Sequence, residues 1–199
     1  MIWFTSDLHL GHANILRHCP ERPWETVDAM DRGLIANLNA RVMPMDHLYV
    51  LGDFTAYGTK LEDVRRYRGR IRCRHVFLVR GNHDKRFQET GLDSPFDWER
   101  DYFELRDAEG KTVLFHYPIE VPSWRGSRHG SYMLHGHIHS VGPAYNERQR
   151  AQGVRRMDVG VDSHNMFPVS MREVVAFFEG VEVRQADHHP SAKVGPSMR

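Results

Sequence analysis

Short apolar segments recur along the chain and predict the strands of a β-sheet core. They lie at residues 1–6, 47–53, 75–84, 111–118, 131–137 and 154–162. Several are continuously apolar, which is typical of strands that are buried on both faces. Most of them end in Gly, Pro, Asp or Asn, so we expect a polar loop to follow each strand.

Two segments of the first half predict amphipathic helices. Within residues 27–42, one helical stripe contains Val27, Met30, Leu34, Leu38 and Val42. Thr26 precedes this stripe and is a suitable N-cap. Gly33 lies inside the helix and costs about 1 kcal/mol relative to alanine, so we expect local packing to compensate. Residues 59–68 predict a second helix, with Leu61 and Val64 facing inward.

The second half is richer in strands and has one further candidate helix. Residues 170–180 place Ser170 and Glu173 at the spacing of a capping box, with Gly180 as a stop, although a strand ending in a tight turn also fits. Together, the elements predict an α/β fold of two packed mixed β-sheets flanked by helices, a four-layer αββα sandwich. We expect a single domain over residues 1–184. Residues 185–199 are polar and aperiodic and predict a disordered C-terminal tail.

Composition narrows the classes of function. The 199 residues carry a net charge of +1, which gives no electrostatic indication of a nucleic-acid or membrane partner. Cys19 and Cys73 are too few for a disulfide framework, and neither a secretory leader nor a membrane span is recognisable, so we expect a cytoplasmic protein. The 14 histidines raise the expectation of metal chemistry, because neutral imidazole is a common metal ligand.

Polar side chains suited to metal binding follow five of the predicted strands. They are Asp7 and His9; Asp53; Asn82, His83 and Asp84; His116; and His137 and His139. Each motif alone also fits an ordinary turn or a buried histidine, but the carboxyl ends of strands in α/β sheets converge on one crevice. Oxygen and imidazole ligands without sulfur suit Mn²⁺, Fe or Zn²⁺. Seven of them exceed the needs of one catalytic metal and fit two metals that share a carboxylate, namely Asp7, His9, Asp53, Asn82, His116, His137 and His139.

The series Asp-x-His, Gly-Asp, Gly-Asn-His-Asp, His and Gly-His-x-His over residues 7–139 resembles the calcineurin-like metallophosphoesterase superfamily. The stretch "TSDLHLGHANI" is most similar to its small bacterial and phage-type members. The resemblance implies one metal on Asp7, His9 and His139, a second on Asn82, His116 and His137, and Asp53 as the bridge. It further implies that a metal-bridging hydroxide attacks phosphorus directly while His83 assists the leaving group. The implied substrate is a phosphate mono- or diester, either a small molecule or a nucleotide, and Mn²⁺ is the favoured metal.

One departure from the superfamily concerns the Gly-Asp motif. Where protein Ser/Thr phosphatases have a second aspartate that orients the catalytic histidine, this chain has Ala56 in "GDFTAYG". The chain therefore does not resemble a protein Ser/Thr phosphatase, and the orienting partner of His83 is unidentified. We assign Asp84 an indirect, orienting role, with a simple turn role as the alternative. His135 is expected to hydrogen-bond locally or to support the ligands.

Other residues near these motifs carry weaker expectations. His12 and Asn14 begin a short predicted helix and are candidate phosphate contacts, with a surface histidine and a cap as the alternative. Arg80 is expected to pair with a carboxylate, and the loop 124–130 to be a solvated connection or the mouth of a pocket. Structural turn roles are assigned to Asp158, Asp162 and His164. Two other functions stay open, a metal-dependent nuclease acting on DNA or RNA and a non-catalytic metal-binding scaffold. The sequence does not fix the physiological substrate within this class, the preference for mono- or diesters, the native metal among Mn²⁺, Fe and Zn²⁺, or the oligomeric state.

Overall fold

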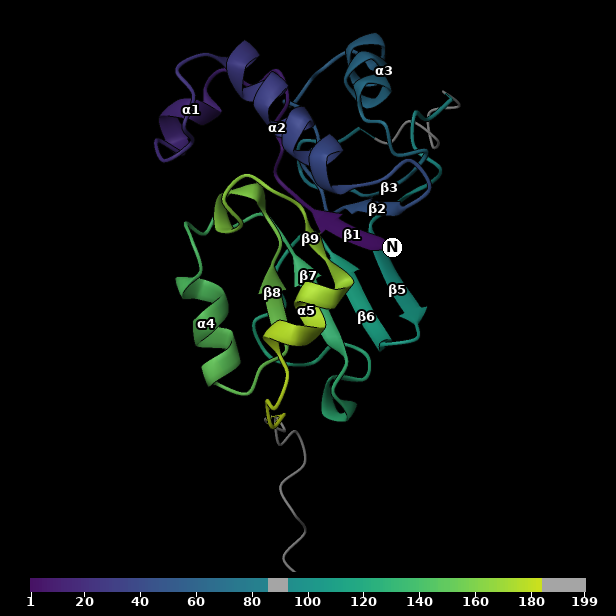
Figure 1. Cartoon of the computed structure of the whole chain (residues 1–199), viewed down its shortest axis with the longest axis vertical. Coiled ribbons are helices and arrows are strands. Elements are labelled where there is room, and N and C mark those ends of the chain that lie inside the picture. The colour runs from purple at the N-terminus through teal and green to yellow at the C-terminus, as the bar shows by residue number, and fades with distance from the viewer. Residues whose placement is uncertain (86–92, 184–199) are drawn as a thin grey trace, which may run out of the picture.

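Two mixed β-sheets pack face to face in the computed structural model, which describes residues 1–85 and 93–183 (Figure 1). The five-stranded sheet has the order β4 (Glu99–Arg100), β3 (His75–Val79), β2 (His47–Val50), β1 (Ile2–Thr5) and β9 (Val169–Ser170). The four-stranded sheet has the order β5 (Tyr102–Asp107), β6 (Gly110–Phe115), β7 (Tyr132–His135) and β8 (Arg156–Asp158). Only the β1–β9 and β5–β6 pairs are antiparallel among these neighbours.

Along the strands, alternate side chains point into the space between the two sheets and fill it. Phe4 and Val79 from the first sheet meet Leu114 and Leu134 from the second in one buried cluster. Neighbouring residues of β1 and β3 point to the opposite face and pack beneath helices. Because both faces of the first sheet are covered, its strands are continuously apolar, as the sequence pattern predicts.

Three helices cover the outer face of the first sheet (Figure 1). They are α1 (Ile15–His18), α2 (Val27–Arg41) and α3 (Leu61–Arg70). The Thr26 side chain accepts a hydrogen bond from the backbone N–H of Ala29, which confirms it as the N-cap of α2. A Cβ at Gly33 would overlap the ring of Trp24, so the indole occupies the space that the glycine leaves.

The remaining helices belong to the second half of the chain (Figure 1). In α5 (Met171–Phe177), Ser170 and Glu173 form the predicted capping box, so this segment is a helix and not a strand. Val174 and Phe178 anchor it on the core between the sheets. The sequence pattern does not predict α4 (Ala144–Ala151), because its buried side chains, Asn146 and Gln149, are polar.

An α/β fold of two packed mixed sheets flanked by helices is therefore confirmed. The outer face of the second sheet is covered in part by Trp124, which packs on Val113, Met133 and Val154. The predicted domain boundary at 184 and the predicted tail 185–199 lie outside the described residues. Within residues 1–85 and 93–183, no helix combines the length and the apolar character that crossing a bilayer requires.

Candidate metal centre

All seven predicted metal ligands lie just after the carboxyl ends of strands, as the sequence predicts. The first sheet supplies Asp7 and His9 after β1, Asp53 after β2 and Asn82 after β3. The second sheet supplies His116 after β6, and His137 and His139 after β7. The ligands thus come from both sheets and meet at one end of the sandwich.

Backbone hydrogen bonds hold the ligand-bearing segments against each other. The Asp7 N–H donates to the Gly52 carbonyl at 3.0 Å, and the His9 N–H donates to the Asp53 carbonyl at 2.9 Å. Across to the second sheet, the His137 N–H donates to the Asp7 carboxylate at 3.0 Å. These bonds hold the segments that carry the predicted ligands close together.

The backbone is strained at most of the predicted ligands. Seven described non-glycine residues have a positive φ, and five of them are Asp7, His9, Asp53, His137 and His139, with φ between 46° and 74°. This left-handed region costs a non-glycine residue of the order of 1–3 kcal/mol and is enriched at functional sites. Strain at these positions indicates that the fold maintains the side-chain directions for a function rather than for stability.

One group of side chains gathers around His9. Its Nε2 atom lies 3.3 Å from Nε2 of His139 and 3.5 Å from Oδ2 of Asp53. Nε2 of His139 is in turn 3.9 Å from Oδ1 of Asp7. These are the spacings of ligand atoms that share one cation, and they involve the three residues predicted for the first metal together with the predicted bridge.

A second group gathers around His116. Its Nε2 atom lies 3.2 Å from Oδ1 of Asn82 and 3.7 Å from Oδ2 of Asp53. The other nitrogen, Nδ1, donates to the carbonyl of Leu51 at 2.8 Å, so Nε2 is the nitrogen available to a cation. The ring of His137 lies 5.0 Å from that of His116, centroid to centroid. Oδ2 of Asp53 is therefore close to an imidazole of each group, which is where a bridging carboxylate has to be.

Glycines allow these segments to approach closely. A Cβ at Gly136 would overlap the Ser6 hydroxyl and the Asp7 carboxylate, and a Cβ at Gly81 would overlap the Asp53 carboxylate. Gly52 has a φ of 97°, and a Cβ at this position would overlap the His116 ring. Gly136 itself has no positive φ, so the glycine in "HGHIH" is required by space and not by a special turn.

The electrostatics of Asp7 and His9 fit a cation. Burial raises the pKa of Asp7 to about 8, and burial lowers the pKa of His9 far below its usual value. The interior therefore disfavours both a free carboxylate and a free imidazolium, whereas a divalent cation stabilises carboxylates and neutral imidazoles together. The donor set of oxygen and imidazole nitrogen suits Mn²⁺, Fe or Zn²⁺.

Asp84 supports the predicted bridge, Asp53, and not the side chain of His83, the predicted catalytic histidine. Its carboxylate accepts N–H bonds from Asp53 at 2.7 Å, from Phe54 at 3.0 Å and from Gly81 at 2.8 Å. It thereby joins the segment after β2 to the segment after β3. The orienting role expected of Asp84 thus acts on Asp53.

A backbone amide occupies the place of the missing orienting aspartate. The Tyr57 N–H donates to Nδ1 of His83 at 3.1 Å, and the His83 N–H donates to Oδ1 of Asp53 at 2.9 Å. Because Nδ1 accepts a hydrogen bond, the proton of the neutral ring is assigned to Nε2. The sequence does not reveal this partner, because a backbone donor has no residue type to recognise.

A cavity of about 370 Å³ opens over the predicted ligands. It is lined by His9, His12, Ile15, His18, Cys19, Asp53, Asn82, His83, His137 and His139. The His12 ring lies in it, with Nδ1 3.3 Å from Nδ1 of His9 and its centroid 5.5 Å from that of His83. The side chain of Asn14 is exposed, makes no cap hydrogen bond and is not part of the lining.

Several residues outside the ligand set have partners that the sequence indicates only in part. Arg80 pairs with Asp101 at 2.9 Å, as expected of a structural arginine. His135 bonds locally to the Gly136 carbonyl at 2.8 Å. The loop 124–130 precedes β7 and so lies at the strand end opposite the ligands.

The sequence assigns Asp162 a turn role only, but its carboxylate also accepts a hydrogen bond from Nδ1 of His139 at 2.8 Å. Arg22, for which the sequence gives no expectation, forms a salt bridge with this carboxylate. Both residues lie far from His139 in the sequence, so no local spacing could have connected them.

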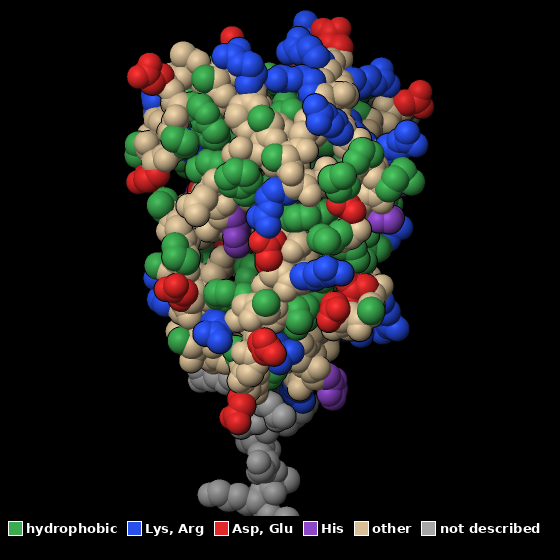
Figure 2. Space-filling view, viewed as in Figure 1, with side chains coloured by type: hydrophobic (Ala, Val, Ile, Leu, Met, Phe, Trp, Pro, Cys, Tyr) green, Lys and Arg blue, Asp and Glu red, His purple; other side chains and the backbone are tan. Residues whose placement is uncertain are grey.

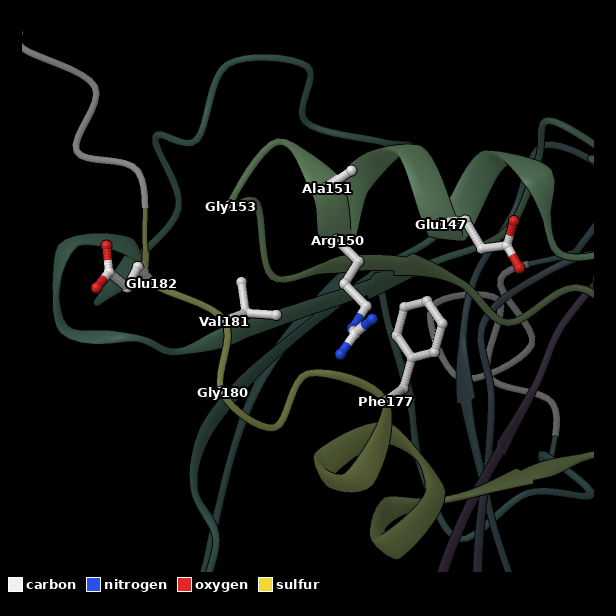
Figure 3. Close-up of a pocket in the computed structure, with 8 residues that line it drawn as sticks. All are labelled: Glu147, Arg150, Ala151, Gly153, Phe177, Gly180, Val181 and Glu182. Carbon is white, nitrogen blue, oxygen red and sulfur yellow. The ribbon is translucent and has the colours of Figure 1, made fainter.

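The surface and a second cavity differ from this centre. A cavity of about 450 Å³ lies between α4 and the end of α5 and is lined by Glu147, Arg150, Phe177 and Val181 among others (Figure 3). It contains none of the predicted ligands. On the face in Figure 2, acidic and basic side chains are interspersed, with Lys and Arg denser at the end of the molecule that carries α3.

Comparison with known proteins identifies the class. The family model described as calcineurin-like phosphoesterase matches residues 1–154. The chain therefore belongs to the calcineurin-like phosphoesterase family and is a metal-dependent phosphoesterase.

Its relatives cover almost the whole chain. MJ1445, an uncharacterized protein of Methanocaldococcus jannaschii, is 31% identical over 188 residues, 89% of this chain and 91% of that protein. The Gene 66 protein of Mycobacterium phage D29 is 31% identical over 202 residues, 87% of this chain and 95% of that protein. A solved structure of AQ665, a protein of unknown function from Aquifex aeolicus, has a TM-score of 0.68 at 26% identity and covers 88% of this chain and 98% of its own.

Proposed function

We propose that the protein hydrolyses phosphate mono- or diesters with two divalent cations, Mn²⁺ being the favoured metal. One cation would be held by Asp7, His9 and His139, the other by Asn82, His116 and His137, with Asp53 between them. The observation that carries the proposal is the position of Asp53, whose Oδ2 atom lies 3.5 Å from His9 Nε2 and 3.7 Å from His116 Nε2. When bound, two such cations supply an acidified water as the nucleophile and positive charge for the phosphate oxygens.

His83 is the group proposed to assist the leaving oxygen, by donating a hydrogen bond that stabilises its developing charge. Its Nδ1 atom is engaged by the Tyr57 N–H, so Nε2 carries the proton of the neutral ring. Its backbone N–H is bonded to Asp53, which keeps the residue beside the predicted bridge. The residue therefore has a fixed position and a hydrogen-bond donor at Nε2 without the aspartate that Ala56 replaces.

His12 is proposed to contact the substrate phosphate. It lines the cavity together with His9 and His83 and is only partly buried, so an incoming anion can reach it. Asn14 stays a weaker candidate, because its side chain is exposed away from the cavity lining. A small phosphoester or a nucleotide fits a cavity of about 370 Å³.

The test combines metal content with hydrolysis. Purified protein is analysed for bound metal and assayed on p-nitrophenyl phosphate and bis-p-nitrophenyl phosphate, with and without Mn²⁺. Asp53→Ala should abolish hydrolysis of both compounds and lower metal content. His83→Ala should lower kcat about 10²–10⁴-fold with the metal retained.

His75→Ala is the matched control, because this partly exposed histidine lies at the start of β3, at the strand end opposite the ligands. It should leave both activities unchanged. If the Asp53→Ala protein hydrolyses both compounds as fast as the parent protein, the assigned bridge takes no part in the reaction. Two bound metals without hydrolysis of either compound would favour the non-catalytic scaffold.

A further inference from the structure

A carboxylate bonds the ring nitrogen of His139 that faces away from the other predicted ligands. Oδ2 of Asp162 lies 2.8 Å from Nδ1 of His139, and Sγ of Cys19 lies 3.5 Å from the same nitrogen. An ionised carboxylate can only accept, so Nδ1 carries the proton. The other nitrogen, Nε2, is thereby left to face His9 and Asp7.

Arg22 ties this carboxylate to the first ligand segment. Its Nε and Nη2 atoms donate to the two oxygens of Asp162 at 2.8 and 2.9 Å. The same guanidinium donates to the carbonyl of Asp7 at 2.8 Å and to that of Leu8 at 3.3 Å. One buried arginine therefore connects the segment after β1 with the support of His139, which comes from the second sheet.

Stability alone does not explain such a pair. The side chains of Arg22 and Asp162 are 0% and 4% exposed, and removing both charges from water offsets much of their attraction. The planar fork of arginine fixes its acceptors in one geometry, so the pair determines where Asp7 and His139 lie relative to each other. Within the described part of the chain, the partner of Nδ1 in His116, which is assigned to the other cation, is the neutral Leu51 carbonyl.

We propose that Arg22 and Asp162 are positioning residues that set the affinity of the cation position formed by Asp7, His9 and His139. The inference rests on the proposed two-cation function. A carboxylate behind a ligating imidazole fixes the tautomer and raises the basicity of the ligand, and its loss typically costs about 10–100-fold in metal affinity. Asp162 lies beyond residue 154, where the family match ends, so this support is not part of the matched segment.

The experiment is calorimetric titration of metal-free protein with Mn²⁺, accompanied by thermal melting without metal. Asp162→Asn removes the charge but keeps the shape. Arg22→Lys keeps the charge but cannot bond both Asp162 oxygens and the Asp7 carbonyl at once. Asp46→Asn is the control, because the Asp46 carboxylate accepts from Trp3 Nε1 at 2.9 Å and from the Met43 N–H at 2.9 Å, next to the start of β2 and away from the ligands.

The parent protein should bind two equivalents of Mn²⁺. In Asp162→Asn and in Arg22→Lys, one equivalent should bind about 10–100-fold more weakly, while the other stays within about twofold. The double variant should lose less affinity than the two single losses multiplied together, because Arg22 and Asp162 belong to one bonded unit. Asp46→Asn should bind both equivalents as the parent does, even where its melting temperature falls.

Two results would overturn the inference. One is unchanged affinity for both equivalents in a folded Asp162→Asn protein, and the other is an equal loss at both. If neither variant folds, NMR of the Zn²⁺-loaded parent decides, since the His139 ring must carry its proton on Nδ1, and a proton on Nε2 contradicts the assignment. A parent that binds fewer than two cations contradicts the proposed function itself, which separates the two failures.

Discussion

Asp84 offers a quantitative test of how the ligand-bearing segments are held together. Its carboxylate accepts three backbone N–H bonds, at 2.7, 2.8 and 3.0 Å, from two different segments. Asp84→Ala removes all three acceptors and leaves the donors in place. The smaller alanine side chain fits without a shift of any other described side chain.

The expected cost follows from the unpaired donors. Each buried N–H left without an acceptor costs about 1–3 kcal/mol, and partial access of water to this turn favours the lower end. Three donors then give about 3–4 kcal/mol. For a chain of this size, about 2–4 °C of melting temperature corresponds to 1 kcal/mol, so the melting temperature should fall by about 6–16 °C.

The assay is thermal unfolding of metal-free protein followed by circular dichroism. A pH of 8 keeps Asp84 ionised, since burial raises its pKa to about 6. Asp97→Ala is the control, because the Asp97 carboxylate accepts a single backbone N–H, from Val76 at 2.8 Å. Its melting temperature should fall by about 2–4 °C, for a loss of about 1 kcal/mol.

The comparison of the two variants decides the outcome. If Asp84→Ala melts no lower than Asp97→Ala, the three bonds do not hold the segments together. A further readout is Mn²⁺ affinity, which should fall in Asp84→Ala because the Asp53 segment loses its attachment, and should be unchanged in Asp97→Ala.

Three further changes have defined outcomes. Gly136→Ala should lower Mn²⁺ affinity at least tenfold by titration, because its Cβ would overlap Ser6 and Asp7. Gly69→Ala, with open space at its Cβ within α3, should raise the melting temperature by about 2–4 °C through helix propensity worth about 1 kcal/mol. Chelation of the metal should lower the melting temperature relative to Mn²⁺ at 100 times its Kd, where each occupied site contributes about 2.7 kcal/mol. An unchanged melting curve in scanning calorimetry would contradict binding to the folded state.

Much of the fold is readable from the sequence, because it is encoded in apolar runs and in helix caps. The six apolar runs contain β1, β2, β3, β6, β7 and β8, and the predicted helices become α2, α3 and α5. Thr26 and Ser170 cap their helices as their positions predict. The order of the ligand motifs could be predicted for the same reason, since each motif immediately follows an apolar run.

The elements that escaped prediction lack that code. The buried face of α4 carries Asn146 and Gln149, which bond to Asp158 and Arg156, so hydrophobic periodicity is absent. The strands β4 and β9 have two residues each, too few for any pattern. In β5, Phe103 and Leu105 alternate with Glu104 and Arg106, so the apolar–polar pattern is sufficient to predict this strand.

The supports of the candidate site could not be predicted from spacing either. Arg22 and Asp162 are 140 residues apart and become neighbours only when the two sheets pack. The Tyr57 N–H that holds His83 belongs to the backbone, which every residue type shares. Long-range geometry and main-chain donors leave no mark in a single sequence.

The predicted ligands are divided between the two sheets. Metal binding therefore depends on how one sheet is placed over the other. A substitution deep in the interior, such as Leu134→Ala against Phe4, touches no ligand, yet it allows the sheets to shift. Loss of the bound metal can therefore be the first sign of a packing defect far from the centre, and a screen for metal retention would detect such defects before unfolding does.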